Sequence, residues 1–470
     1  MSVQPTNAAI ACGQTISANT TLTAPLGPCN TQYGIVIGAN GITLDCVSKA
    51  NSIIGTTVGG TGPSLAGVYL NGMSGVTVEN CALTDWFEGV LLNSSSGNTI
   101  TDNDAYGNSL YGFELASSSN NTLTHNKAST NAYQNFWLDS NSNYNTLTNN
   151  SAEYGGQTGY YISGSNNAFN GNLAYSNTQY GFYLPTSANM NNFMRNNASD
   201  NAFGGYLIYC FTRSLVTCST ASPNQDTLIS NAASWNTGPG FWIVASSQNV
   251  LTGNIADHNT GNGFDIEAHS TLNTFNGNNA YGNGNDGFFL YYGSADNTLR
   301  ANSADDNGGA GFELSHNGGG TLTSNTATGN LLAGFEITDS SLNKLTGNTA
   351  TNSLYGFYIW ALYSNANTLT GNTASQNGYG FYLSTYSTSL GNTLTSNTAS
   401  SNTSDGFFVG SLSILNTLSS NAAYSNGGYG YRDLSTGSGT KGTANTYTAN
   451  TCLIFHPNTL GCSSPSGLAV

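Results

Sequence analysis

The sequence predicts an all-β fold, a parallel β-helix of about 16 coils with about 22 to 24 residues in each coil. Two repeated signatures lead to this prediction. A glycine followed by an aromatic residue recurs along most of the chain, and a pattern of asparagine, leucine and alanine runs between these steps. Short alternating apolar stretches broken by Gly or Asn are typical of strands and tight turns, whereas leucine-rich repeats usually need a helical return.

The first signature is expected to form one wall of each coil. Its steps include Gly112-Phe113, Gly311-Phe312 and Gly380-Phe381, and an aliphatic residue follows two positions after the aromatic one. Because successive side chains of a strand point to opposite faces, the aromatic and aliphatic residues both point inward. The residue between them then points outward.

The second signature, Asn-x-Leu-x-x-Asn-x-Ala-x-x-Asn, supplies the other walls. In the copy from Asn367 to Asn377, we expect Leu369 and Ala374 in the core. We assign the asparagines to the corners, because Asn tolerates left-handed backbone angles and stacked amides can hydrogen-bond from coil to coil. The alanine is expected to be small because the coil turns tightly there.

The repeat divides the chain into three parts. Residues 1–46 are expected to form an N-terminal lead-in and cap segment, and residues 47–434 the β-helix, with inserts near 47–66 and 209–226. Residues 435–470 leave the repeat, so we expect a C-terminal cap or tail with a disulfide, because solenoid ends need a cap.

Composition excludes several classes of protein. The chain has 470 residues, of which 7% are charged, and a net charge of -15 with only eight Lys and Arg. Nucleic acid is not an expected partner, because no basic run can neutralise a phosphate backbone. No apolar run is long enough to span a membrane, and the N-terminus lacks the features of a secretory signal. If the protein is exported, its signal is expected to be absent from this chain.

Eight cysteines without a CxxC motif favour disulfides in an oxidising compartment. We expect Cys210 to pair with Cys218 and Cys452 with Cys462, because each pair closes a short loop, and we leave the other connectivities open. The remaining cysteines are Cys12, Cys29, Cys46 and Cys81. Six sequons permit N-glycosylation, at Asn19, Asn93, Asn120, Asn149, Asn197 and Asn402.

The segment from Ala11 to Cys46, "ACGQTISANTTLTAPLGPCNTQYGIVIGANGITLDC", resembles the lead-in of pectin-lyase-like right-handed parallel β-helix repeat proteins. That group includes carbohydrate-binding and sugar-hydrolase β-helices and proteins of nitrous-oxide-reductase maturation. The resemblance implies a right-handed coil, export and a connection to saccharides, but it supplies no reaction. A lyase of this group would need basic residues. Here they are widely separated, so the chain is poorly suited to bind a polyanionic substrate.

The outward position after the inward aromatic residue is itself aromatic in many coils. Such a column forms an apolar stacking surface, which a sugar chain or a second copy of the protein could cover. We favour the second copy, because an uninterrupted face suits lateral packing. The column comprises Trp137, Tyr161, Tyr183, Trp242, Phe289, Tyr358, Tyr382 and Phe408.

Acidic residues share this outward position. Glu313 and Glu336 should be neighbours on adjacent coils, at a spacing near that of a retaining glycosidase pair. They are weak catalytic candidates, since any acidic pair on adjacent coils has this spacing, and we favour a solvated acidic face. Asp265, Glu267 and His269 alternate along one strand and are weak candidates for a divalent-ion site. No cofactor is expected, with Ca²⁺ left open.

These observations predict an exported, non-enzymatic structural or interaction protein, located extracellularly or at a cell surface. The sharper hypothesis is self-association into a homopolymer such as a layer, sheath or filament. The alternative is a protein that binds or cleaves a polysaccharide, with a cell-surface glycan as its partner.

Overall fold

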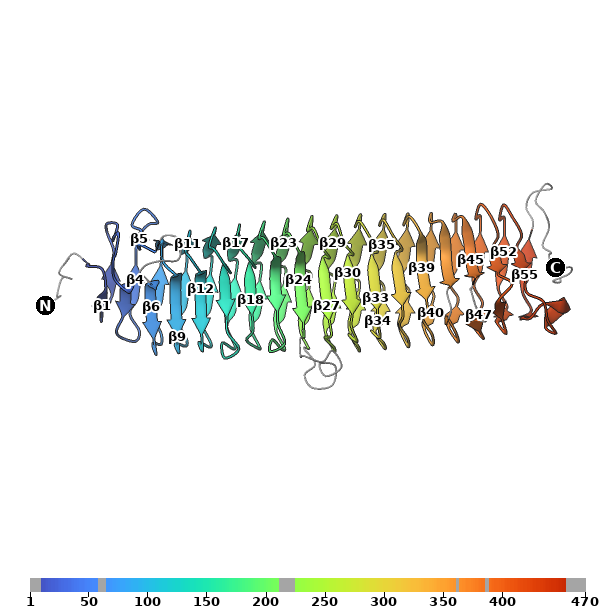
Figure 1. Cartoon of the computed structure of the whole chain (residues 1–470), viewed down its shortest axis with the longest axis horizontal. Helices are drawn as coiled ribbons and strands as arrows, with labels where there is room; N and C mark the ends of the chain where they lie inside the picture. The colour runs from blue at the N-terminus through green and yellow to red at the C-terminus, as the bar shows by residue number, and fades with distance from the viewer. Residues whose placement is uncertain (1–9, 58–64, 211–224, 361–362, 385–388, 454–470) are drawn as a thin grey trace. The chain divides into compact units, whose positions relative to one another are not determined.

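The computed structural model describes residues 10–57, 65–210, 225–360, 363–384 and 389–453. The fold is an all-β right-handed parallel β-helix of about 16 turns, which confirms the predicted fold class. The chain divides into two compact units, Met1–Leu207 and Ile208–Val470. In each unit the strands form three parallel sheets, in which a strand pairs with its counterparts in the neighbouring coils (Figure 1). We call them sheets A, B and C.

In the first unit, sheet A carries the glycine-aromatic strands, sheet B the Asn-x-Leu strands and sheet C the alanine strands. Sheet A contains β1 (Gln14–Ile16), β3 (Tyr33–Ile37), β6 (Ala66–Asn71), β9 (Glu88–Asn93), β12 (Tyr111–Ala116), β15 (Phe136–Leu138), β18 (Tyr160–Ile162) and β21 (Tyr180–Leu184). Sheet B contains β2 (Thr20–Thr21), β4 (Thr43–Asp45), β7 (Thr77–Glu79), β10 (Thr99–Thr101), β13 (Thr122–Thr124), β16 (Thr146–Thr148), β19 (Ala168–Asn170) and β22 (Asn192–Met194). Sheet C contains β5 (Ile53–Ile54), β8 (Ala82–Thr84), β11 (Asp104–Tyr106), β14 (Lys127–Ser129), β17 (Ser151–Glu153), β20 (Leu173–Tyr175) and β23 (Asn197–Ser199).

The second unit repeats this arrangement, and β24 (Gly204–Tyr209) includes the boundary between the units. Sheet A contains β27 (Phe241–Val244), β30 (Phe264–Glu267), β33 (Phe288–Tyr291), β36 (Phe312–Ser315), β39 (Ala333–Thr338), β42 (Tyr355–Trp360), β45 (Tyr379–Ser384), β49 (Phe407–Val409) and β53 (Tyr431–Asp433). Sheet B contains β25 (Thr227–Ile229), β28 (Val250–Thr252), β31 (Thr274–Asn276), β34 (Thr298–Arg300), β37 (Thr321–Thr323), β40 (Lys344–Thr346), β43 (Thr368–Thr370), β47 (Thr393–Thr395), β51 (Thr417–Ser419) and β54 (Thr446–Thr448). Sheet C contains β26 (Ala232–Ser234), β29 (Ile255–Asp257), β32 (Asn279–Tyr281), β35 (Ser303–Asp305), β38 (Thr326–Thr328), β41 (Thr349–Thr351), β44 (Thr373–Ser375), β48 (Thr398–Ser400), β52 (Ala422–Tyr424) and β55 (Thr451–Leu453). Besides these there are a two-stranded sheet, β46 (Ser389–Leu390) with β50 (Ser413–Ile414), and a 3-10 turn, η1 (Thr440–Gly442).

The predicted core residues are buried and lie in register. Phe312 pairs with Phe335 across β36 and β39, their rings stack with centroids 4.8 Å apart, and both side chains are fully buried. Leu369 and Ala374, from sheets B and C, are also fully buried. Most described coils therefore place an aromatic, a leucine and an alanine in columns of like residues, as the spacing of the two signatures predicts.

Alanine and glycine face each other at the corner between sheets C and A. A Cβ added to Gly311 would lie 2.8 Å from the Cβ of Ala327 and 2.8 Å from the carbonyl oxygen of Gly334. The strand of sheet A begins so close to sheet C that neither residue can be larger. This close approach of the two strands is the physical reason why the alanine, which we expected to be small because of a tight turn, is small.

The asparagines form ladders. The Nδ2 atom of Asn372 donates to the carbonyl oxygen of Leu345 and to Asn397 Oδ1, both at 2.9 Å, and its Oδ1 accepts from the backbone and side chain of Asn348. One part of the expectation is wrong. The left-handed angle falls on the residue before the ladder asparagine, as at Gly371, where φ is 63°. Asparagine is thus needed for its amide, which satisfies buried backbone groups at the corner.

Two disulfides close the first coils, Cys12–Cys29 and Cys46–Cys81. Cys210 and Cys452 are disulfide-bonded as well, but Cys218 and Cys462 lie outside the described residues, so the two expected pairings stay predictions. Strands β1 to β4 precede residue 47, and β54 and β55 follow residue 434, so the sheets extend beyond the range that we assigned to the β-helix. Residues 58–64 of the first expected insert and residues 211–224 of the second fall outside the described residues.

Of the six sequons, Asn402 is unsuited to modification in the folded chain. It is 1% exposed, and its Nδ2 donates to Asn426 Oδ1 as part of a ladder. Asn93 is half-buried, and Asn19, Asn120, Asn149 and Asn197 are exposed. Within the described part of the chain, no helix has the length and apolar character that a membrane crossing requires.

Candidate functional site

The outward face of sheet A in the second unit carries the candidate site. We call the outward residues from Trp242 on β27 to Phe408 on β49 the acidic-aromatic strip. Strand alternation points the residue between the buried aromatic and the buried aliphatic away from the core. The parallel register then aligns one such residue per coil, in the order Trp242, Asp265, Phe289, Glu313, Glu336, Tyr358, Tyr382 and Phe408.

The aromatic residues predicted in this position are aligned within each unit. Tyr382 stacks on Phe408 with ring centroids 4.4 Å apart, and Tyr358 meets Tyr382 edge to face at 5.6 Å. The other three, Trp137, Tyr161 and Tyr183, lie in register on sheet A of the first unit. All eight rings are half-buried. The column is therefore a partly sheltered stacking surface, and the rings are less bare than their outward position suggested.

Three carboxyl groups meet near the middle of the strip. Glu313 pairs with Glu336 across β36 and β39, as predicted. Asp286, which immediately precedes the Gly287 step, is hydrogen-bonded to Glu313 through its side chain. Burial, together with the neighbouring Asp286 and Glu336 charges, raises the pKa of Glu313 to about 8. Burial raises the pKa of Asp286 to about 6, and a hydrogen bond from the backbone N–H of Ala310 opposes this rise.

Glu336 is the most deeply buried member of this group. It is 3% exposed, and its Oε1 accepts from Trp360 Nε1 at 2.5 Å and from Thr338 Oγ1 at 3.0 Å. Its Oε2 is buried without a hydrogen-bond partner among the described residues, and burial raises its pKa. The solvated acidic face that we expected is therefore wrong at Glu336. Sheltered carboxyl groups with raised pKa values take its place.

The weak metal candidates do not come together. Asp265 is 8% exposed and accepts from Asn262 Nδ2 at 2.8 Å, and burial raises its pKa to about 7. Glu267 accepts from Trp242 Nε1 at 2.9 Å. His269 lies beyond the end of β30, at a φ of 64°, with its ring against Tyr292. In the described ranges, no three His, Cys, Asp or Glu side chains are grouped as a metal site would need.

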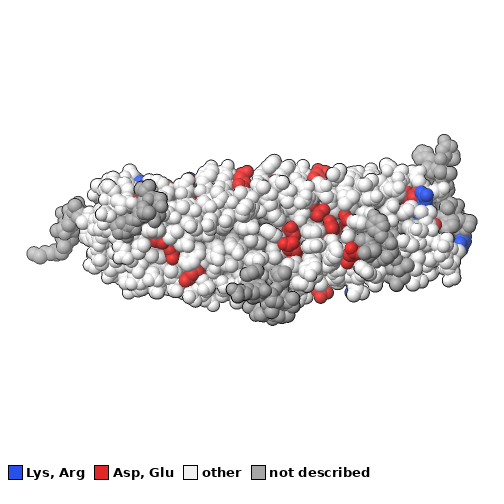
Figure 2. Space-filling model, in the orientation of Figure 1, with Lys and Arg blue, Asp and Glu red and all other residues white. Residues whose placement is uncertain are grey.

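Basic side chains are rare around the strip. Among the described outward residues of sheet A in the second unit, Arg432 on β53 is the one cation. Its guanidinium lies 5.7 Å from the ring of Phe408, and its Nη1 is 3.8 Å from Asp405 Oδ2. Figure 2 shows the same imbalance over its visible face, where acidic side chains outnumber basic ones.

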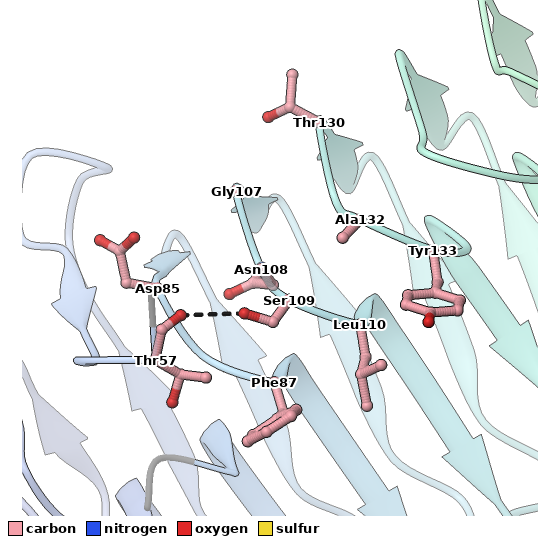
Figure 3. A pocket seen from close by; sticks show the side chains of 10 residues that line it. All are labelled: Thr57, Asp85, Phe87, Gly107, Asn108, Ser109, Leu110, Thr130, Ala132 and Tyr133. Carbon is pink, nitrogen blue, oxygen red and sulfur yellow. Dashed lines mark hydrogen bonds between the residues drawn. The ribbon is translucent and has the colours of Figure 1, made fainter. Parts of the chain in front are cut away.

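The first unit has a groove of about 620 Å³ next to its own sheet A (Figure 3). Ser109 Oγ donates to the carbonyl oxygen of Thr57 at 3.0 Å, and Tyr133 contributes a side chain that is 42% exposed. The lining residues are Thr57, Asp85, Phe87, Gly107, Asn108, Ser109, Leu110, Thr130, Ala132 and Tyr133. They provide hydroxyl, carboxylate and aromatic groups without a cation, which is a chemistry similar to that of the strip.

Two carboxyl groups on sheet A of the first unit, on β9 and β12, also have raised pKa values. Burial raises the pKa of Glu88 to about 8, and the charge of Glu114 adds to this effect. Burial, with a contribution from Asp139, raises the pKa of Glu114 to about 7. Sequence reasoning missed Glu88, Asp286 and Trp360. The first two stand directly before a glycine of the first signature, and this position is also outward, which was the available signal.

A family model described as the right handed beta helix region matches residues 66–221 and 297–447, which together make up more than half of the chain. A second model, described as the periplasmic copper-binding protein NosD, matches residues 208–355. No curated protein matches the chain.

Solved structures resemble the chain in fold alone. The periplasmic alginate epimerase AlgG is 11% identical, with a TM-score of 0.36 over 90% of this chain and 78% of that one. The A-module of Azotobacter vinelandii mannuronan C-5 epimerase AlgE6 is 15% identical, with a TM-score of 0.38 over 76% and 87% of the two chains. The Dettilon tailspike protein is 12% identical, with a TM-score of 0.32 over 79% and 61%.

Proposed function

The chain belongs to the right-handed β-helix family, and from this premise we propose that it is an exported glycan-binding protein whose binding surface is the acidic-aromatic strip. The observation that carries the proposal is the register of the strip. Half-buried aromatic rings and hydrogen-bonding carboxyl groups share one column, at one residue per coil, along β27 to β49.

This arrangement suits a sugar chain that runs across the strands. Coils repeat at about 4.8 Å, close to the length of one pyranose unit along an extended glycan, so successive outward side chains can contact successive sugars. Aromatic side chains offer apolar contacts to the C–H groups of a sugar, and carboxyl groups bond its hydroxyls. Tyr382, Phe408 and Glu313 supply both kinds of group within a few coils.

Export is supported by the cysteines. Cys12–Cys29 and Cys46–Cys81 are disulfides, and disulfides persist in oxidising compartments. A protein located outside the cytoplasm, in a periplasm or at a cell surface, would meet polysaccharides there.

Binding is better supported than cleavage. A glycosidase needs two accessible carboxyl groups on opposite sides of the scissile bond. Here Glu313 is hydrogen-bonded to Asp286, and the second oxygen of Glu336 is buried. We therefore propose a non-catalytic role, and release of reducing ends that Glu313→Gln abolishes would show instead that the protein is an enzyme.

The test is affinity electrophoresis and calorimetry against a panel of soluble neutral and acidic polysaccharides. Tyr382→Ala should weaken binding about fivefold or more, since losing an aromatic contact of this kind costs about 1 kcal/mol or more. Tyr281→Ala is the matched control, because Tyr281 is 41% exposed in the same unit but lies on sheet C. Equal affinities for the two variants would place any binding elsewhere.

Self-association through the same face is the second candidate, favoured by the stacked rings of Tyr355, Tyr358, Tyr379, Tyr382 and Phe408. Two copies packed through the strip would, however, bring sheltered carboxyl groups together without cations. Analytical ultracentrifugation decides between the two candidates, because assembly that Tyr382→Ala abolishes would favour self-association.

A further inference from the structure

We propose that the acidic-aromatic strip accepts uncharged glycans and rejects polyuronates, because the half-buried Asp286 and Glu313 lie at its centre beside the buried Glu336 and, among the described residues, no Lys or Arg of this face lies near them to pair with a uronate. This inference rests on the glycan-binding function proposed above, and it adds the charge class of the ligand.

The first step is the number of acceptor oxygens in the strip. Asp286, Glu313 and Glu336 come from three successive coils, and Asp265 lies one coil before Asp286 on the same sheet. Asp265 Oδ1 and Glu336 Oε2 are buried without a hydrogen-bond partner among the described residues. When they are ionised, these carboxyl groups only accept hydrogen bonds and carry negative charge, so a ligand that brings further carboxylates is disfavoured.

The second step is the distance to the nearest positive charge on this face. Arg432 lies on β53, and Glu336 lies on β39, four strands earlier in sheet A. Four coil spacings amount to roughly 19 Å, which exceeds the Debye length of about 8 Å at physiological ionic strength. Arg432 also lies close to Asp405, so its charge is already partly balanced.

The third step compares the two classes of ligand at Glu313, which is half-buried and so remains open to solvent. A sugar hydroxyl can donate to an ionised carboxylate or accept from a protonated carboxyl. A uronate carboxylate can only accept, so it can bond a protonated Glu313 but is repelled by an ionised one. The neutral glycan is therefore bound in either protonation state.

This reasoning predicts a pH signature. The pKa of Asp286 is raised to about 6 and that of Glu313 to about 8, so these two residues carry little charge at pH 5.5 and are mostly ionised at pH 8.5. Rejection of uronates should grow across this interval, whereas affinity for the parent neutral glycan should change little. A shape-based rejection would not depend on pH.

The experiment compares each neutral glycan with its own C6-oxidised form, so that only the charge differs. Amylose, glucomannan and laminarin are titrated by calorimetry before and after oxidation, at pH 5.5 and pH 8.5 and in low salt. We expect the oxidised form to bind at least tenfold more weakly at pH 8.5. The gap should narrow at pH 5.5, in 0.5 M NaCl and in the Glu313→Gln variant.

Two results would overturn the inference in distinguishable ways. Oxidised glycans that bind as tightly as their neutral parents would refute the charge selectivity and leave glycan binding intact. If no glycan of either kind binds, both the proposed function and this inference fall.

Glu267→Gln is the control variant, since Glu267 is hydrogen-bonded to Trp242 at the start of the strip, away from the central group. Circular dichroism confirms that both variants keep the fold.

Discussion

Replacing one ladder asparagine by alanine should cost far more stability than the small change in side-chain volume suggests. Asn372 is fully buried at the corner between β43 and β44, and its side chain takes part in four hydrogen bonds. Asn372→Ala removes all four bonds. It leaves the backbone N–H of Asn348 and the carbonyl of Leu345 without this partner, whereas Asn397 Oδ1 keeps the bond from the backbone N–H of residue 372.

The expected magnitude follows from these bonds. Each intramolecular hydrogen bond contributes about 1 kcal/mol net, and a buried group left without a partner costs about 1 to 3 kcal/mol, so we expect a loss of roughly 4 kcal/mol. Because solenoid repeats contact only their neighbours, the damage should be local. Hydrogen exchange read by mass spectrometry should show faster exchange in peptides covering 343–375 than in peptides covering 250–276. Urea unfolding gives the total effect.

Two further variants test the reasoning. Thr370→Ala, on the outward face of β43, should change stability by about 0.5 kcal/mol or less. Asn372→Asp keeps the acceptor and loses both N–H donors, so it should be unstable at pH 7 and partly recover in acid, where the protonated carboxyl can donate again. If Asn372→Ala costs no more than Thr370→Ala, or if exchange rises equally in distant coils, the ladders do not stabilise the coils as we describe.

Three other predictions concern burial. Asp265 has a folded pKa of about 7 against an ordinary 3.8, so its stabilising protonated form is lost as pH rises through about 7. Asp265→Asn should therefore lose less stability than the parent chain between pH 4 and pH 8, by up to about 4 kcal/mol in urea unfolding. Gly311→Ala should destabilise by about 1 to 3 kcal/mol in the same assay, because its Cβ would overlap Ala327 and a backbone carbonyl. In a glycosylating host, mass spectrometry should find Asn402 unmodified because it is 1% exposed, whereas modification at Asn402 would contradict the ladder.

The fold could be predicted because the same residue pattern recurs many times along the sequence. Phe312, Leu369 and Ala374 each occupy a position whose side chain recurs in nearly every coil, so one assignment of the period places the whole core. The register of Glu313 with Glu336 followed from the same period. The period did not predict why asparagine stands at the corners. The left-handed angle falls one residue earlier, at Gly371, and periodicity alone does not tell neighbouring turn residues apart.

The chemistry of the site was harder to predict, since it depends on contacts between different outward columns. Glu313 and Glu336 stand at the same repeat position, yet Glu336 is almost fully buried because Trp360, two residues further along the next strand, covers it and donates to it. Asp286 reaches Glu313 from the position before the glycine step. A period predicts which side chains share a column but not how large side chains of one column lean over the next. These contacts between columns bury the carboxyl groups and raise their pKa values. For this reason the face that the sequence suggested to be solvated contains sheltered carboxyl groups.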